Sequence, residues 1–210
     1  MPQRDTGGGF SLKPREWAVL LFTLGYVGLF SVYFLAIGNH EFLWYVTTML
    51  VLMGLALAGA RAAEFPAYLL WALSLWGLAH MAGGGVQVGD SVLYAYRLVP
   101  IAGEGEFTIL KYDQVVHAYG FGVAALVLRH LLLRAFPDAA GSKSLYVFPA
   151  LGAMGLGAVN EIIEFMAVVM LPNTNVGGYY NTALDLVFNA LGAVLAMAGA
   201  ALLSRRSSAD

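Results

Sequence analysis

The chain contains no cysteine, and charged residues make up only 11% of its 210 positions. The lack of thiols excludes a disulfide-stapled fold, and no Gly-X-Y period is present to indicate collagen. Soluble domains carry about 25% charged and about 45–50% apolar residues, whereas 60% of this chain is hydrophobic. Because so few charges cannot cover a water-facing globule, the composition predicts a membrane protein. The net charge of −2 gives no indication of a nucleic-acid partner.

Six apolar stretches come close to or exceed the length of about 20 residues that a helix needs to cross a bilayer. They cover residues 17–37, 42–62, 66–82, 113–133, 145–171 and 180–203. The sequence therefore predicts an all-α fold, a polytopic membrane helix bundle with six transmembrane helices that forms one integral membrane domain over residues 1–210. The first stretch is too long for a signal-peptide core, so we expect it to stay on the mature protein.

The basic residues predict the orientation, because Lys and Arg gather on the cytoplasmic side. With the N-terminus inside, nine fall on the inner side and two, Arg97 and Lys111, on the outer side. The nine are Arg4, Lys13, Arg15, Arg61, Arg129, Arg134, Lys143, Arg205 and Arg206. We therefore expect both termini in the cytoplasm and a multi-pass protein of the plasma or inner membrane. The one long connection, residues 83–112, then lies outside, as a short hairpin, an interfacial cap or a solvated connector.

Ionisable residues inside membrane spans are rare and usually functional. At a rise of about 1.5 Å per residue, those of four spans fall in the same outer third of the bilayer. They are His80 on the third span, Asp113 and His117 on the fourth, Glu161 and Glu164 on the fifth, and Asp185 on the sixth. Asn160, Asn181 and Asn189 accompany them. This shared depth predicts one polar cluster.

The helical spacing puts these groups on faces with small residues, which let membrane helices approach closely. Asp113 and His117 share a face with Gly120 and Ala124, and Glu161 and Glu164 share one with Ala153 and Gly157. On the last span, the shared face carries Asp185, Asn189, Gly192 and Ala196. We therefore expect the last three spans to pack together around inward-facing carboxylates, with His80 joining from the third span.

Two imidazoles and four carboxylates form a ligand set that suits Zn, Mn, Fe or Mg. The sequence thus predicts a divalent-metal site made by His80, Asp113, His117, Glu161, Glu164 and Asp185, although a hydrogen-bonded network that locks the helices would use the same residues. Taken singly, His80 could cap its helix and Asp113 could complement a helix dipole. Asn189 is more typical of a contact between helices than of a site residue.

The runs KYDQVVHAYGFG, NEIIEF and YYNTALDLVFNALGAVLA resemble the VanZ-like proteins and the related YjdF-type inner-membrane proteins. The resemblance covers about residues 76–200, and the loop LYAYRLVP is nearer to the YjdF branch. The matching positions are Asp113, His117, Glu161, Glu164, Asp185, Asn189 and Gly192. The VanZ pattern usually has Gln where Glu164 stands. It also has an Arg in the loop that corresponds to residues 172–179, and this chain has no Arg there. The resemblance implies a polytopic membrane protein and, for VanZ itself, a link to glycopeptide-antibiotic tolerance.

Three functions fit the sequence. The first is an intramembrane enzyme that acts on a lipid or lipid-linked substrate at the outer leaflet, with a metal-activated water and Glu161 or Glu164 as catalytic base. The second is a small ion-coupled transporter, which would need polar residues on the inner halves of the spans, where few occur. The third is a non-catalytic membrane protein that binds a lipid or a partner. No nucleophile elbow, HExxH, P-loop or Rossmann fingerprint decides between them.

Overall fold

The computed structural model describes residues 12–38, 46, 50, 54, 63–104, 107–170 and 178–206. Most of these residues lie in long helices, as the apolar stretches predict. The helices are α1 (Pro14–Ala36), α3 (Ala67–Gly85), α4 (Tyr112–Ala135), α5 (Ser144–Met170) and α6 (Tyr179–Arg206). Two short 3₁₀ turns, η1 (Leu93–Ala95) and η2 (Pro137–Ala139), lie in the connections. The helical class of the fold is therefore confirmed.

Four of these helices, α1, α4, α5 and α6, are long and apolar enough to cross a membrane. Helix α3 is not among them, and its last turns contain His80 and a run of three glycines. Of the predicted span 42–62, only Val46, Leu50 and Gly54 lie within the described residues, and all three are helical. The structure thus supports a multi-pass protein with four candidate spans and does not confirm the predicted number of six.

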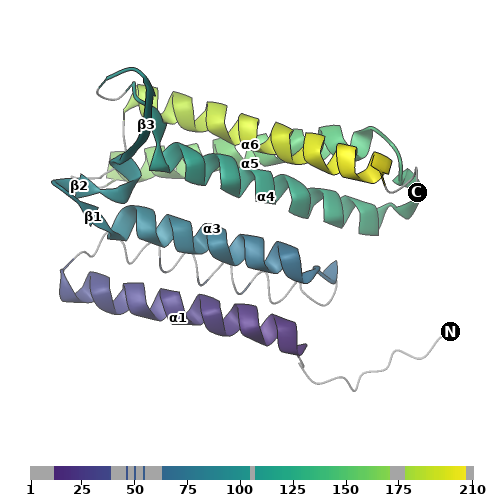
Figure 1. The fold of residues 1–210 in the computed structure, drawn as a ribbon, viewed down its shortest axis with the longest axis horizontal. Helices are drawn as coiled ribbons and strands as arrows, with labels where there is room; N and C mark the ends of the chain where they lie inside the picture. Colours follow the sequence, from purple (N-terminus) through teal and green to yellow (C-terminus); the bar gives the residue numbers. More distant parts are fainter. Residues whose placement is uncertain are drawn as a thin grey trace.

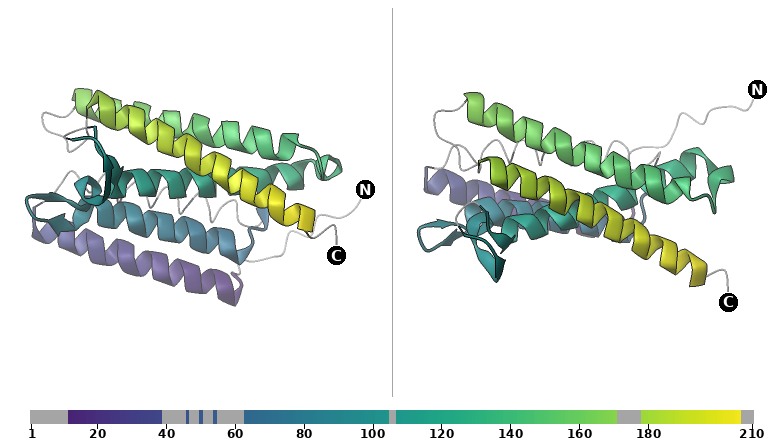
Figure 2. Two further views of the ribbon diagram at one scale, coloured as in Figure 1. Left: turned by 45° about the horizontal axis from the view of Figure 1, so that its top comes forward. Right: turned by 90° about the horizontal axis from the view of Figure 1, so that it is seen from above.

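The described helices lie roughly side by side, in the order α1, α3, α4, with α5 and α6 packed on the far side of α4 (Figures 1 and 2). Polar contacts join α1 to α3: the Thr23 and Ser74 hydroxyls lie 2.6 Å apart, and Tyr26 donates to the Ser74 carbonyl at 3.0 Å. Between α3 and α4, the ring of Trp76 packs directly against Gly120. The small residue at this position lets the indole lie against the backbone of α4.

Two antiparallel hairpins connect α3 to α4. The first pairs β1 (Gln87–Val88) with β2 (Ser91–Val92), and the second pairs β3 (Arg97–Ala102) with β4 (Ile109–Lys111). In the second, Arg97 lies opposite Lys111 and Ala102 opposite Ile109, with an irregularity between them. Both hairpins lie at the end of the bundle where α3 ends and α4 begins (Figure 1), which we call the hairpin end.

At the opposite end, two contacts tie the end of α4 to the residues that precede α3. Arg134 forms an ion pair with Glu64 at 3.0 Å, and the Nε2 of His130 lies 2.7 Å from the Ala63 carbonyl. The Arg134 guanidinium lowers the pKa of the exposed Glu64 carboxyl below its usual range, because it donates a hydrogen bond to the charged form. His130 therefore has a structural partner far from the predicted cluster.

Candidate functional site

Three helices bring five of the six predicted site residues together near the hairpin end. Asp113 and His117 lie one turn apart on α4, with Nε2 of His117 3.6 Å from Oδ1 of Asp113. Helix α5 contributes Glu161, whose Oε1 lies 3.7 Å from Nδ1 of the same imidazole. Helix α6 contributes Asp185, which is fully buried. The prediction that α4, α5 and α6 pack together is confirmed, and each of them carries acidic residues to this cluster.

Close packing of α4 on α6 depends on two glycines. A Cβ at Gly122 would lie 3.1 Å from the carbonyl oxygen of Gly192, and a Cβ at Gly192 would overlap the backbone of Ala118. Backbone atoms cannot move aside as the end of a side chain can. The absence of side chains at this crossing therefore allows Asp185 to reach the imidazole on α4.

The contact with Asn189 fixes the tautomer of His117. Nδ1 of His117 lies 2.9 Å from Oδ1 of Asn189, an atom that can only accept a hydrogen bond. Nδ1 therefore carries the proton and donates it, and in the neutral imidazole the lone pair is on Nε2. That is the nitrogen that faces Asp113. Metal-binding histidines are oriented in the same way, with the second nitrogen donating to an oxygen behind it.

The carboxylates of Asp113 and Asp185 are held by one amide. Nδ2 of Asn181 donates to Oδ2 of Asp185 at 2.6 Å and lies 3.4 Å from Oδ2 of Asp113. The amide is itself oriented, because the ammonium group of Lys111 donates to its Oδ1. The other oxygen of Asp185, Oδ1, is buried and has no hydrogen-bond partner. One oxygen of Asp185 is thus fixed and the second remains available to a ligand.

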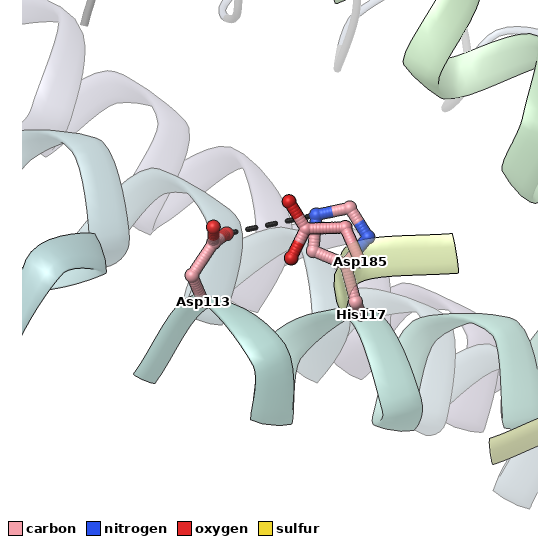
Figure 3. Close-up of side chains that lie close together, drawn as sticks. All are labelled: Asp113, His117 and Asp185. Atoms are coloured by element: carbon pink, nitrogen blue, oxygen red, sulfur yellow. Dashed lines mark ion pairs between the residues drawn. The ribbon is translucent and has the colours of Figure 1, made fainter. Parts of the chain in front are cut away.

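Asp113, His117 and Asp185 can each offer one ligand atom, and these atoms lie within 4.8 Å of one another. Figure 3 shows the two side chains of α4 with the carboxylate of Asp185 in front of the imidazole. A second group with the same property consists of His117, Glu161 and Glu164. Because Nδ1 of His117 is engaged by Asn189, the first group is the better candidate for a metal site.

The two glutamates of α5 differ in their surroundings. Asn160 donates to Oε1 of Glu164 at 2.8 Å and lies 3.5 Å from Oε1 of Glu161. Glu161 is buried, and its Oε2 has no hydrogen-bond partner. The carboxylate of Glu161 thus lies beside His117 through Oε1 and keeps Oε2 unpaired, whereas Glu164 is held by the amide one turn earlier.

His80, the sixth predicted residue, belongs to neither ligand group among the described residues. Its Nδ1 lies 2.5 Å from the hydroxyl of Tyr94, which also lies 2.9 Å from its backbone carbonyl. The ring of Tyr94 occupies the space that a side chain at Gly83 would fill. The tyrosine of η1 thus covers this turn of α3.

Two residues that organise this end of the bundle, Lys111 and Tyr94, were not predicted as part of the cluster. Asn181 was expected to accompany it, because an amide four residues before Asp185 shares its helix face. Lys111 and Tyr94 act across chain separations of 70 and 14 residues, which no local pattern encodes.

Comparisons with curated proteins and with solved structures give no match. A family model described as a predicted membrane protein does match the chain, but this match does not specifically support the resemblance to VanZ-like and YjdF-type proteins. This match covers residues 18–206 and therefore includes all four candidate spans almost completely, both hairpins and every member of the polar cluster. On this match, the chain belongs to the DUF2238 family of predicted membrane proteins.

Proposed function

We propose that this protein is a metal-dependent membrane protein in which Asp113, His117 and Asp185 bind one divalent cation. The observation that carries the proposal is the buried Oδ1 of Asp185, which has no hydrogen-bond partner and belongs to a carboxylate beside a second carboxylate and an imidazole lone pair. An unsatisfied buried polar group costs about 1–3 kcal/mol, and more when it is charged. A cation bound at this position would offset that cost and the repulsion between the two acids.

The donor set restricts the kind of ion. Two carboxylate oxygens and one imidazole nitrogen suit Zn, Mn, Fe or Mg and give no preference for a soft, thiolate-seeking metal. Three protein ligands also leave coordination positions open, as in catalytic zinc sites. Asn189 and Asn181 would support this site from behind, by orienting His117 and the two aspartates.

The reaction that we propose is hydrolysis of a lipid or lipid-linked substrate at the outer leaflet. When bound, the metal would supply an activated water and a Lewis acid. Glu161 is the proposed general base, because its carboxylate lies beside His117 and its buried Oε2 has no hydrogen-bond partner. Glu164, held by Asn160, is the second acid of this pair and would keep negative charge near the base.

The proposed topology is that of the sequence analysis: six spans in the plasma or inner membrane, with both termini in the cytoplasm. At the end of the bundle opposite the hairpins, where α1 begins and α4 and α6 end, the described basic residues include Lys13, Arg134, Lys143 and Arg205. Arg97 and Lys111 belong to the second hairpin at the other end. This asymmetry supports a cytoplasmic location of the termini. We also propose that the chain is related to the VanZ-like or YjdF-type proteins. In this proposal, His80 is a neighbour of the metal site and not one of its ligands.

An apolar cluster favours hydrolysis over ion-coupled transport. Towards the opposite end from the polar residues, α4, α5 and α6 are joined by small and apolar side chains, namely Ala125, Ala150, Ala153, Ala193 and Met197. These residues are closely packed and offer no donors or acceptors to a moving ion. A polar site that stops within the bundle is typical of chemistry at one surface.

Elemental analysis tests the proposal. The purified protein is expected to carry about one transition-metal or Mg ion per chain, and Asp185→Asn is expected to lose it, because the isosteric amide keeps the contact with Asn181 but is a poor ligand. Asp138→Asn, on η2 at the opposite end, is the matched control and should keep the ion. A wild-type protein that stays ion-free after incubation with Zn, Mn, Fe and Mg in turn would contradict the proposal. It would show that the cluster is a hydrogen-bonded network that only holds the helices together.

A further inference from the structure

The strand β3 is apolar and exposed on both of its faces. Successive side chains of a strand point to opposite sides, yet Leu98, Val99 and Ile101 are all exposed, the last by 64%. A run of apolar residues on both faces is typical of strands that are covered on both sides. Within the described residues, β3 pairs only with the three-residue strand β4. A two-stranded hairpin with this composition therefore needs a further apolar neighbour.

Side-chain contacts hold this hairpin in a defined shape. The guanidinium of Arg97 turns back across it and donates to the Gly103 carbonyl and to the Thr108 hydroxyl, both at 3.1 Å. Gln114, buried on the first turn of α4, donates to the Thr108 carbonyl at 2.7 Å and accepts from the amide of Lys111 at 3.1 Å. The guanidinium of Arg97 is thus bound within the hairpin, and the outer surface of the hairpin remains apolar.

The exposed surface of the hairpin continues onto α6. The ring of Phe107 packs edge-on against Tyr180, and Tyr180 does the same with Tyr179. We call this surface the apolar patch; it consists of Leu98, Val99, Ile101, Phe107, Tyr179 and Tyr180, all of them exposed. Tyrosines at a helix end are characteristic of the interface between a bilayer and water. The patch therefore adjoins a helix whose apolar outer face meets lipid.

The strand also runs in the right direction for such an interface. In Figure 1, β3 rises across the ends of α4 and α6 instead of continuing along their axes. Since these helices are candidate spans, a strand that crosses their ends lies close to the plane of the membrane surface. The partner strand β4 ends at Lys111, which directly precedes α4.

We propose that the β3–β4 hairpin lies in the headgroup region of the bilayer at the hairpin end and inserts its apolar patch among the lipid chains. Exposed apolar side chains grouped in this way mark an interaction site. The contact of Phe107 with Tyr180, at the start of the candidate span α6, identifies lipid as the occupant. Addition of a strand from a second copy is disfavoured by Pro100, which interrupts the N–H donors in the middle of β3. The inference does not depend on a metal or on hydrolysis.

The absence of cysteine allows a clean test by single-cysteine labelling. Ile101→Cys and Leu98→Cys, on opposite faces of β3, are labelled with an environment-sensitive fluorophore and reconstituted in phosphatidylethanolamine–phosphatidylglycerol vesicles. We expect blue-shifted emission that spin-labelled lipids quench and aqueous iodide does not, at one position or both. The matched control is Asp90→Cys, on the polar turn of the first hairpin at the same end, where iodide should quench and lipid should not.

Two results would overturn the proposal. Quenching of both β3 positions by iodide to the level of position 90, without any effect of spin-labelled lipid, would place the hairpin in water. Efficient disulfide cross-linking of Ile101→Cys between two chains, again without lipid quenching, would show that a second copy covers the patch. Neither result bears on the metal content, so a failure here is distinguishable from a failure of the proposed function.

Discussion

Replacing Gly192 by alanine is expected to destabilise the bundle strongly, although alanine is the better helix former by about 1 kcal/mol. The added Cβ would overlap the backbone of Ala118 on α4, and the helices would have to move apart. Overpacking of a tight contact typically costs about 1–3 kcal/mol, and a clash with backbone belongs at the upper end of that range. The measurement is the midpoint of unfolding of the purified protein in mixed micelles with increasing SDS.

Gly199→Ala provides the matched control, because it lies on the same helix and a Cβ there has no heavy atom within 4 Å. Its unfolding midpoint should stay unchanged or rise slightly. Equal midpoints for the two variants would contradict the close contact between α4 and α6. Since Asp185 reaches His117 across this contact, the Gly192 variant should also weaken any property that depends on the cluster.

Hydropathy alone predicted the helices α1, α4, α5 and α6 well. The expected stretches 113–133 and 145–171 agree within two residues at each end with α4 and α5, because the change from apolar to polar residues at a span boundary is steep. Helix α3 also lies close to its expected bounds, but its glycines and His80 reduce its hydropathy. The sequence allowed a short hairpin within residues 83–112, whereas the structure has two hairpins there. Three of their four strands have only two or three residues, which leave no periodicity to detect.

The shared depth of the acids and histidines predicted most of the cluster, but rotation about each helix axis was only partly readable. The sequence grouped Gly120 with Asp113 and His117, yet Gly120 faces Trp76 of α3, and Gly122 makes the contact with α6. His80 lies at a similar depth, but its ring is engaged by Tyr94. Depth follows from counting residues, whereas the direction of a side chain depends on how the helices pack.

Asn189 shows why the division between contact and site residues was too simple. The sequence favoured a role as a contact between helices, and the amide does join α6 to α4. The same hydrogen bond sets the tautomer of His117 and so determines which nitrogen faces the aspartates. This one hydrogen bond thus serves both helix packing and the chemistry of His117, and a sequence pattern cannot reveal both roles of one residue.

Removal of the imidazole of His117 is expected to abolish stabilisation by a bound metal. A ligand at roughly a hundredfold excess over its Kd raises the free energy of unfolding by about 2.7 kcal/mol, provided that it binds only the folded state. The wild-type protein should therefore gain this amount when the preferred metal is added, as measured by thermal or SDS unfolding. His117→Gln should gain little, because its amide can still contact Asn189 but replaces a good nitrogen ligand.

His130→Gln separates this effect from adventitious binding to histidine. Both histidines lie on α4 and both contact a protein oxygen, but His130 contacts the carbonyl of Ala63 at the opposite end of the bundle. The His130 variant should lose some stability without the metal and still gain the full metal-dependent increment. If the two variants lose the increment equally, the ion is not held by the cluster. If neither loses it, the lone pair of His117 is not a ligand, and the carboxylates must bind the ion without it.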